Sequence, residues 1–195
     1  MNPELLQEKF QSGLTFDQFK ADARRNHKTL QELYDELQVP EADIQMFSNL
    51  VEQHGGQINV LSFAEEWCGD AVRAFPLLTK VCEQVDGMDF RIQPSDAEEN
   101  QPFVKNWPKG ERNPIPIIVF LDKDFNELGH WIERSEPGDA FSRNLREEFK
   151  DLSDRQYFRE AKPRVFEAFK TQFWKDTLSE WQQLLSVKEQ VAQAD

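Results

Sequence analysis

The first quarter of the chain repeats apolar residues at the period of a helix. In the first such stretch, the apolar positions are Phe19, Ala23, Leu30, Leu33 and Leu37. Thr15 and Gln18 have the spacing of a capping box ahead of this stretch, and Pro40 ends it. A second helix is predicted over about 41–53, because an apolar face there is followed by Gly55 and Gly56.

The middle of the chain changes to short apolar runs, which are typical of buried strands. These runs occupy residues 58–63, 90–92, 117–121 and 128–132. Helices are predicted over about 69–85, 101–107 and 140–149. The last two runs form a hairpin, because the residues between them have turn composition. This order predicts an α/β domain in which a helical crossover joins a parallel pair of strands.

The chain beyond Ser153 is again helical and is rich in aromatic side chains. Phe166, Phe169 and Phe173 lie at positions i, i+3 and i+7, which is one face of a helix. Such a stripe usually packs against the rest of a fold, so we expect it on the N-terminal helices or the sheet. The sequence is therefore divided into a helical segment 1–55, an α/β domain 56–150 and a helical segment 151–195.

The net charge of the chain limits which classes of molecule the protein is expected to bind. Acidic residues number 36 against 23 basic ones, which gives a formal net charge of −13. This balance argues against a nucleic-acid partner, because phosphate binding needs a clustered basic surface. No apolar run approaches the roughly 18 residues that span a membrane, and the first residues lack the pattern of a secretory signal. We therefore expect a cytoplasmic protein with no membrane partner.

Cys68 is the residue with the strongest chemical signal. It stands between the first predicted strand and the following helix, where free backbone N–H groups and the helix dipole favour a thiolate. Asp70 opposes this effect by like charge, and Arg73 assists it if its side chain folds back toward the sulfur. The direction of the net pKa shift stays open at this point.

The residues around Cys68 resemble the active-site segment of thioredoxins. Residues 64–70 read Ala-Glu-Glu-Trp-Cys-Gly-Asp, and Pro76 has the spacing of the family's helix-kinking proline. Ile115 and Pro116 resemble the family's isoleucine and cis-proline at the start of a strand. The resemblance covers about 57–150, is closest to bacterial thioredoxin-like proteins that begin Trp-Cys-Gly-Asp, and implies a thioredoxin-like fold with helical N- and C-terminal extensions.

Two departures from the family pattern bear on mechanism. Ala71 stands where the second cysteine of the family's C-x-x-C pair would be. Cys82 does not replace it, because 14 residues of helix span about 21 Å, against the roughly 7 Å that a disulfide tolerates; we expect Cys82 to pack in the core. The family's buried acid corresponds to Leu61 or Ser62, so proton transfer would use Glu65, Glu66 or water.

These features predict a monothiol thiol-disulfide oxidoreductase in which Cys68 forms a mixed disulfide. Its partners would be disulfides of client proteins or a low-molecular-weight thiol. Ile115 and Pro116 would bind the client, with Ile115–Pro116 as a cis peptide facing Cys68. The predicted neighbourhood of the cysteine consists of Trp67, Gly69, Asp70, Ala71 and Arg73. The alternative is a redox-inactive adaptor that binds a protein through the same groove or through its aromatic helices.

Other chemistry has little support in the sequence. His27, His54 and His130 are scattered without a metal-ligand spacing, so no metal site is expected. The glycine-rich patterns of nucleotide-binding loops are absent from the sequence as well. The reaction considered above needs no cofactor. The sequence leaves the oligomeric state open.

Overall fold

The protein is described by a computed structural model over residues 1–186, and it folds around a four-stranded sheet. The strands are β1 (Ile58–Ala64), β2 (Met88–Pro94), β3 (Ile117–Leu121) and β4 (Glu127–Ile132). Their order in the sheet is β2-β1-β3-β4. β1 and β2 are parallel, and β3 is antiparallel to both of its neighbours. The predicted strand pairing and α/β class are confirmed.

The parallel pair is joined by α5 (Gly69–Gln84), as the predicted crossover requires. The register places Val60 opposite Phe90 on β2 and opposite Phe120 on β3. Every residue of β1 and β3 is buried. Because successive side chains of a strand point to opposite faces, both faces of this sheet must be covered.

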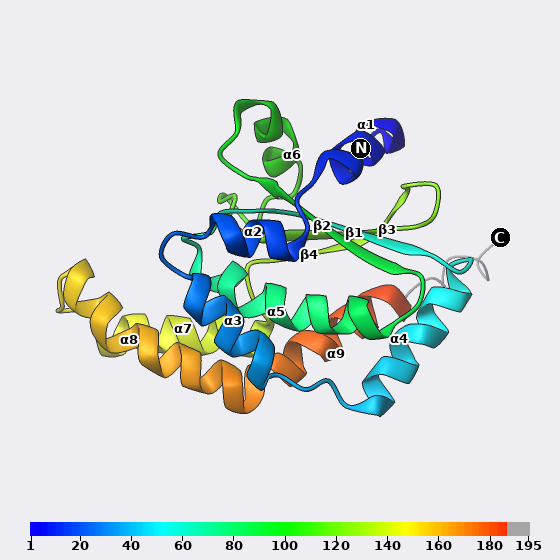
Figure 1. The fold of residues 1–195 in the computed structure, drawn as a ribbon. Helices are drawn as coiled ribbons and strands as arrows, with labels where there is room; N and C mark the ends of the chain where they lie inside the picture. The colour runs from blue at the N-terminus through cyan, green and yellow to red at the C-terminus, as the bar shows by residue number, and fades with distance from the viewer. Residues whose placement is uncertain (187–195) are drawn as a thin grey trace.

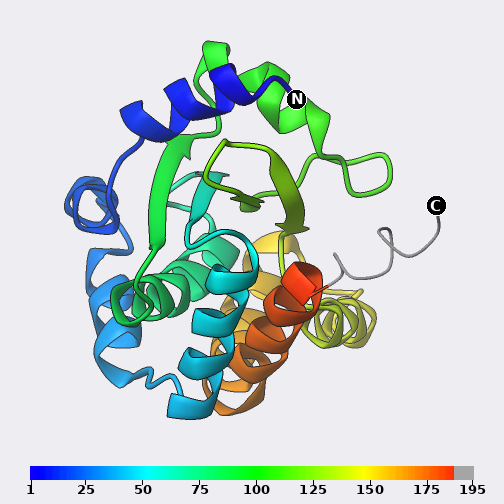
Figure 2. The same ribbon diagram turned by 90° about the vertical axis from the view of Figure 1, so that its right-hand side faces the viewer.

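Helices cover the two faces unequally (Figure 1). α1 (Pro3–Ser12) and α6 (Gln101–Asn106) lie on one face, and α2 (Phe16–Asp22), α3 (His27–Glu36), α4 (Glu41–Gln53) and α5 lie on the other. Two hydrophobic clusters follow from this division. The smaller contains Leu6, Phe10, Leu61, Phe63 and Val119, and the larger contains Val60, Phe75, Phe90, Phe120 and Trp181. Figure 2 shows the same two-sided arrangement from the side.

The N-terminal region differs from the sequence prediction in two places. α1 was not predicted, and its Leu6 and Phe10 are buried against the sheet. The apolar repeat between Phe19 and Leu37 does not form one helix, because α2 ends at Asp22 and α3 begins at His27. Asn26 lies in the break and donates a hydrogen bond to the Glu66 carbonyl at 2.6 Å. The predicted capping box of Thr15 and Gln18 is confirmed.

The C-terminal region is helical, as predicted. It contains α7 (Glu136–Glu148), α8 (Asp154–Ala168), the π-helical turn η2 (Phe169–Phe173) and α9 (Trp174–Ser186). The remaining short element, the 3-10 turn η1 (Glu98–Asn100), lies in the middle of the chain and precedes α6. α7 begins earlier than predicted, because Ser135 is its N-cap and Pro137 occupies its first turn. Residues 187–195 of the predicted helical segment lie outside the described residues.

The aromatic stripe packs against the core rather than facing solvent. Phe169 is buried in the large cluster, and Phe166 and Phe173 pack against it. In α9, Trp181 is fully buried and meets Trp131 of β4 edge to face at 5.7 Å between ring centroids. The helices at both ends of the chain therefore share one hydrophobic core with the sheet.

None of the helices among residues 1–186 is long and apolar enough to cross a membrane.

Candidate functional site

Cys68 is the N-cap residue of α5, at the end of the loop that leaves β1. Its backbone is extended, and its carbonyl accepts the first helical hydrogen bond from the Val72 N–H at 3.0 Å. The residue is 7% exposed, whereas its neighbour Trp67 is 59% exposed. Cys68 is thus nearly covered, although the preceding residue in the chain exposes its indole.

The loop before β3 meets the thiol. The Ile115–Pro116 peptide bond is cis, which confirms the prediction. The Cys68 thiol donates a hydrogen bond to the Ile115 carbonyl, with 3.3 Å between sulfur and oxygen. Residues 47 positions apart are therefore brought into contact. Sequence reasoning placed this pair correctly.

Opposing effects act on the pKa of Cys68, and the net direction is upward. Burial of the thiol is the largest cause and raises the pKa. Backbone N–H groups of Ala71 and Asp70 bond to the sulfur and lower its pKa. The charge of Asp70 raises this pKa, and the charge of Arg73 lowers it. The expected stabilisation of the thiolate by the helix start is present, but burial outweighs it.

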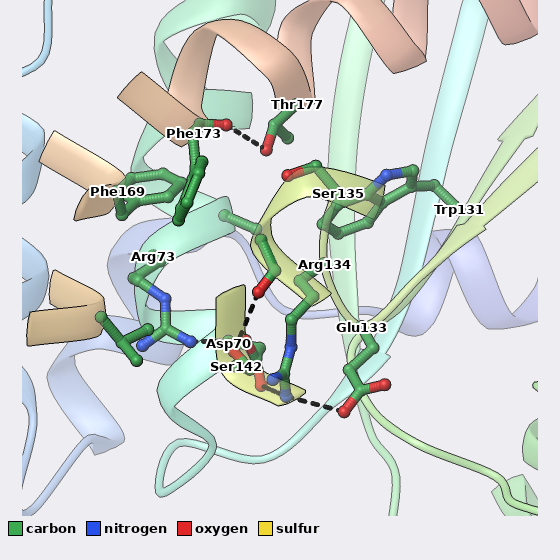
Figure 3. A pocket seen from close by; sticks show the side chains of 13 residues that line it. Asp70, Arg73, Trp131, Glu133, Arg134, Ser135, Ser142, Phe169, Phe173 and Thr177 are labelled. Carbon is green, nitrogen blue, oxygen red and sulfur yellow. Dashed lines mark hydrogen bonds and ion pairs between the residues drawn. The ribbon is translucent and has the colours of Figure 1, made fainter. Parts of the chain in front are cut away.

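Asp70, two residues after Cys68 in the chain, binds two arginines (Figure 3). Its carboxylate accepts hydrogen bonds from Arg73 and from Arg134, the latter at 2.7 Å. Arg134 also donates to Glu133 at 2.7 Å. Asp70 is only 13% exposed, and a buried carboxylate of this kind needs such partners.

Arg73 points to Asp70 instead of folding over the sulfur. Its guanidinium also lies over the Phe166 ring, 5.4 Å from the centroid. The charge of Arg73 lowers the pKa of the Cys68 thiol, as expected, while its hydrogen bond goes to the Asp70 carboxylate. The physical reason is that Asp70, one helical turn earlier, is the nearer anion.

Glu133 was missed by sequence reasoning. It follows β4, has a φ of 70°, and donates its backbone N–H to the Pro116 carbonyl at 2.8 Å. Its nearly buried carboxylate pairs with Arg134, Arg112 and Lys109. A left-handed conformation is uncommon for a residue with a side chain. Glu133 therefore ties the cis-proline loop to the network at Asp70.

The network encloses a small cavity, which Figure 3 shows together with its lining side chains. The cavity has a volume of about 20 Å³ and is lined by Asp70, Arg134, Ser135 and Phe173 among others. A space of this size has room for about one water molecule. It is too small to admit a client side chain, so it belongs to the support of the site and not to a substrate pocket.

Of the two acids expected to replace the missing family acid, Glu65 is engaged elsewhere, whereas one carboxylate oxygen of Glu66 is buried without a hydrogen-bond partner in the described part of the chain. The Ser62 hydroxyl donates to the Ile117 carbonyl at 2.8 Å, and Leu61 packs on the opposite face of the sheet. Glu65 accepts hydrogen bonds from the Ser95 hydroxyl and the Asp96 N–H, and burial is the main cause that raises its pKa. Within the described residues, no hydrogen bond joins the Glu65 or Glu66 side chain to the Cys68 sulfur.

Cys82 is less deeply packed than predicted. It lines a surface pocket of about 180 Å³ with Thr79, Glu83 and Asp89, while packing partly against the core. Burial of its thiol and then the charges of Asp89 and Glu83 raise its pKa far above the usual range. Both cysteines are free thiols. In residues 1–186, no cluster of three or more His, Cys, Asp or Glu residues is arranged to hold a metal.

A cysteine at a helix start beside a cis-proline, on a sheet of this topology, defines a thioredoxin-like protein. A family model described as thioredoxin matches residues 13–171, and the chain belongs to this family. The match extends into the helices before and after the α/β domain. A search of curated proteins finds no match.

Two solved structures have a similar fold. A protein of unknown function from Pseudomonas aeruginosa has a TM-score of 0.64 and 17% identity, over 92% of this chain and 95% of its own. An HIV epitope scaffold has a TM-score of 0.63 and 17% identity, over 92% of this chain and 96% of its own. At this identity the similarity shows the fold alone.

Proposed function

We propose that the protein is a monothiol thiol-disulfide oxidoreductase that acts on client disulfides in the cytoplasm through Cys68. The observation that carries this proposal is the contact between the Cys68 thiol and the Ile115 carbonyl, immediately before cis-Pro116. This contact puts the proposed nucleophile next to the backbone of Ile115, which is half-buried. Membership of the thioredoxin family supports the general class of reaction.

The first step is attack by the Cys68 thiolate on a client disulfide. A bond forms between Cys68 and one client sulfur, and the other client sulfur leaves as a thiolate that takes up a proton. Backbone N–H groups of Asp70 and Ala71 stabilise the attacking thiolate. As the thiol loses its proton, its hydrogen bond to the Ile115 carbonyl is lost, which leaves that carbonyl free to accept an N–H from the client.

The second step needs a thiol from outside the chain, because Ala71 replaces the resolving cysteine. One low-molecular-weight thiolate attacks Cys68 of the mixed disulfide and releases the second client thiol. A second one then attacks the small-molecule sulfur bound to Cys68, which regenerates the Cys68 thiolate and produces a small-molecule disulfide. The client gains two electrons and two protons in total, and two small thiols supply them.

The experiment that tests the proposal is trapping of mixed disulfides on the native protein. The reduced protein is mixed with insulin, quenched with acid and analysed by intact mass. The expected result is an adduct on Cys68 that disappears on adding 2-mercaptoethanol and is absent from Cys68→Ser. If no adduct forms at any pH up to the ordinary range of cysteine ionisation, the redox proposal fails.

The adaptor is retained as a second candidate because the Cys68 thiol is buried and burial raises its pKa. An adaptor would bind its partner without a covalent bond. Pull-down of the same partner by the native protein and by Cys68→Ser, with no adduct on the native protein, would favour it.

A further inference from the structure

A large groove opens directly beside the cysteine. It has a volume of about 800 Å³ and lies between the first turn of α5 and the helices α7 and α8. Trp67 and Gly69, the two neighbours of Cys68, form part of its wall. We name it the α7–α8 groove and define it by Trp67, Gly69, Arg143, Arg146, Phe158 and Lys162. A volume of this order accommodates several residues of a peptide or a small organic molecule.

Three of the four acidic side chains that line the groove are nearly buried, whereas four of its six basic side chains are exposed. The carboxylates of Asp70, Glu133 and Asp139 are only 13%, 9% and 13% exposed, because arginine and lysine partners cover them. The side chains of Arg143 and Arg146 are 61% and 56% exposed. Six basic and four acidic side chains line the groove in a chain whose net charge is −13. The surface that faces solvent here is thus locally cationic.

One acid in the wall is exposed as well. Glu147 is 75% exposed, and Lys150 pairs with it at 2.6 Å. The exposed Lys162 has no ion-pair partner within residues 1–186. Arg143 and Arg146 also pair, at 4.0 and 3.5 Å, with the exposed Glu136 and Asp154 just outside the groove wall. The four exposed cations of the wall still outnumber these two acids and Glu147 together.

Aromatic side chains accompany these cations. The Arg146 guanidinium lies 3.8 Å from the centroid of the Tyr157 ring. Five large apolar side chains of the described residues are conspicuously exposed, and two of them, Trp67 and Phe158, belong to this groove, each 59% exposed. Exposed aromatics next to arginines are the usual anchors of a protein-binding surface.

We propose that the α7–α8 groove binds a carboxylate-rich segment of the client polypeptide that also carries an apolar side chain. The cations select the carboxylates, and Trp67 and Phe158 receive the apolar side chain. A polypeptide is the occupant because an inorganic anion would leave both aromatics uncovered. The inference rests on the proposed function in one respect, that the bound segment belongs to a protein whose disulfide reacts at Cys68.

The binding test uses Cys68→Ser, so that no covalent capture contributes. The probe is a fluorescein-labelled decapeptide of glutamates around a central leucine and phenylalanine, and its matched partner has glutamine in place of every glutamate. Fluorescence anisotropy measures both dissociation constants. We expect the acidic peptide to bind about tenfold more tightly than its partner, and the advantage to shrink as salt is raised.

Substitutions of groove residues test whether the acidic peptide binds in the α7–α8 groove. Arg146→Gln and Lys162→Gln should each weaken the acidic peptide by about two- to fivefold. Phe158→Ala should weaken both peptides, because it removes an apolar contact without changing charge. Lys28→Gln is the matched control, since it removes the same charge from a side chain that is 89% exposed on α3. Circular dichroism checks that each variant remains folded.

The inference would be overturned by equal affinity of the two peptides, or by Arg146→Gln, Lys162→Gln and Phe158→Ala variants that behave like Lys28→Gln. Binding of free glutarate as tightly as the peptide would also overturn it, because the site would then be one for small anions. Exchange of native Cys68 with the neutral 2-hydroxyethyl disulfide is measured separately and does not use the cations. Failure of that exchange removes the proposed function, whereas failure of peptide binding removes only the docking site.

Discussion

The two ends of α5 place the same side chain in different chemical surroundings. At the first end, the Cys68 sulfur receives backbone N–H groups from Asp70 and Ala71 and has Arg73 nearby. Toward the last end, burial and the charges of Asp89 and Glu83 raise the pKa of Cys82, and only Arg91 acts in the opposite direction. No backbone N–H contributes there.

The difference follows from the geometry of a helix. The first N–H groups of a helix have no carbonyl partner within it, so they are available to a sulfur at the N-cap. Near the end of the helix, the backbone N–H groups already donate to carbonyls of the preceding turn, so none is available to a cysteine there. The residue exposures would suggest the reverse ranking, because Cys68 is buried and Cys82 is only partly so. Burial is nevertheless the largest cause that raises the pKa of each thiol, and backbone N–H groups lower the pKa of Cys68 alone.

The largest effect is expected from restoring a second thiol at the first end. Ala71→Cys creates a C-x-x-C pair, because the N–H of residue 71 already contacts the Cys68 sulfur. An internal attack would release the client without an external thiol, so insulin reduction with dithiothreitol should rise from background to sustained turnover. Turbidity of precipitating insulin measures this rate.

The matched control for that variant is Thr79→Cys, which creates the same spacing with Cys82. We expect no insulin reduction from it, because this end lacks the cis-proline loop and the free N–H groups. Equal activity of the two variants would contradict the comparison between the ends of α5.

Alkylation of the native protein compares the thiols directly. Iodoacetamide should modify Cys68 about tenfold faster than Cys82 at pH 8, because the thiolate fraction falls tenfold for each unit by which the pKa rises. Since burial raises the pKa of Cys68 above its usual value, its rate should keep increasing beyond about pH 8.5. Peptide mapping by mass spectrometry gives both rates; a faster Cys82 would reverse the ranking.

Neutralising Asp70 should increase the difference in alkylation rate between Cys68 and Cys82. Asp70→Asn removes the charge that raises the pKa of Cys68 and keeps a hydrogen-bond acceptor for Arg73 and Arg134. The pKa of Cys68 should fall, and alkylation near pH 7.5 should accelerate about fivefold. Asp89→Asn is the control, because it acts on Cys82 and should leave the Cys68 rate unchanged.

The smallest effect is expected from substitutions of Glu133, which has a left-handed backbone conformation and supports the Cys68 end of α5. Glu133→Gly and Glu133→Ala remove the same ion pairs, but only glycine adopts a φ of 70° without steric cost. Glycine should therefore exceed alanine by about 1 kcal/mol in free energy of unfolding. Urea denaturation measures the difference, and equal stabilities would show that residue 133 relaxes to another conformation.

Much of the fold was predictable from local patterns. Short, β-branched apolar runs such as 117–121 favour buried strands, and the change of pattern after residue 63 places a helix start near Cys68. The thiol and the cis-proline were identified through the resemblance to thioredoxins. By contrast, α1 was missed because its amphipathic pattern is weak, and Leu6 and Phe10 are buried only through contact with the sheet.

The sequence by itself determined the strands, most of the helices, the place of Cys68 at a helix start and the absence of a cysteine at position 71, because each of these depends on residues close together in the chain. Only the tertiary structure decided the charge network and the groove. Arg134 reaches Asp70 across 64 positions, and the break between α2 and α3 depends on a hydrogen bond from Asn26 to the carbonyl of Glu66. Long-range pairs of this kind leave no periodic signal, since their energies depend on burial and on partners that folding alone brings together.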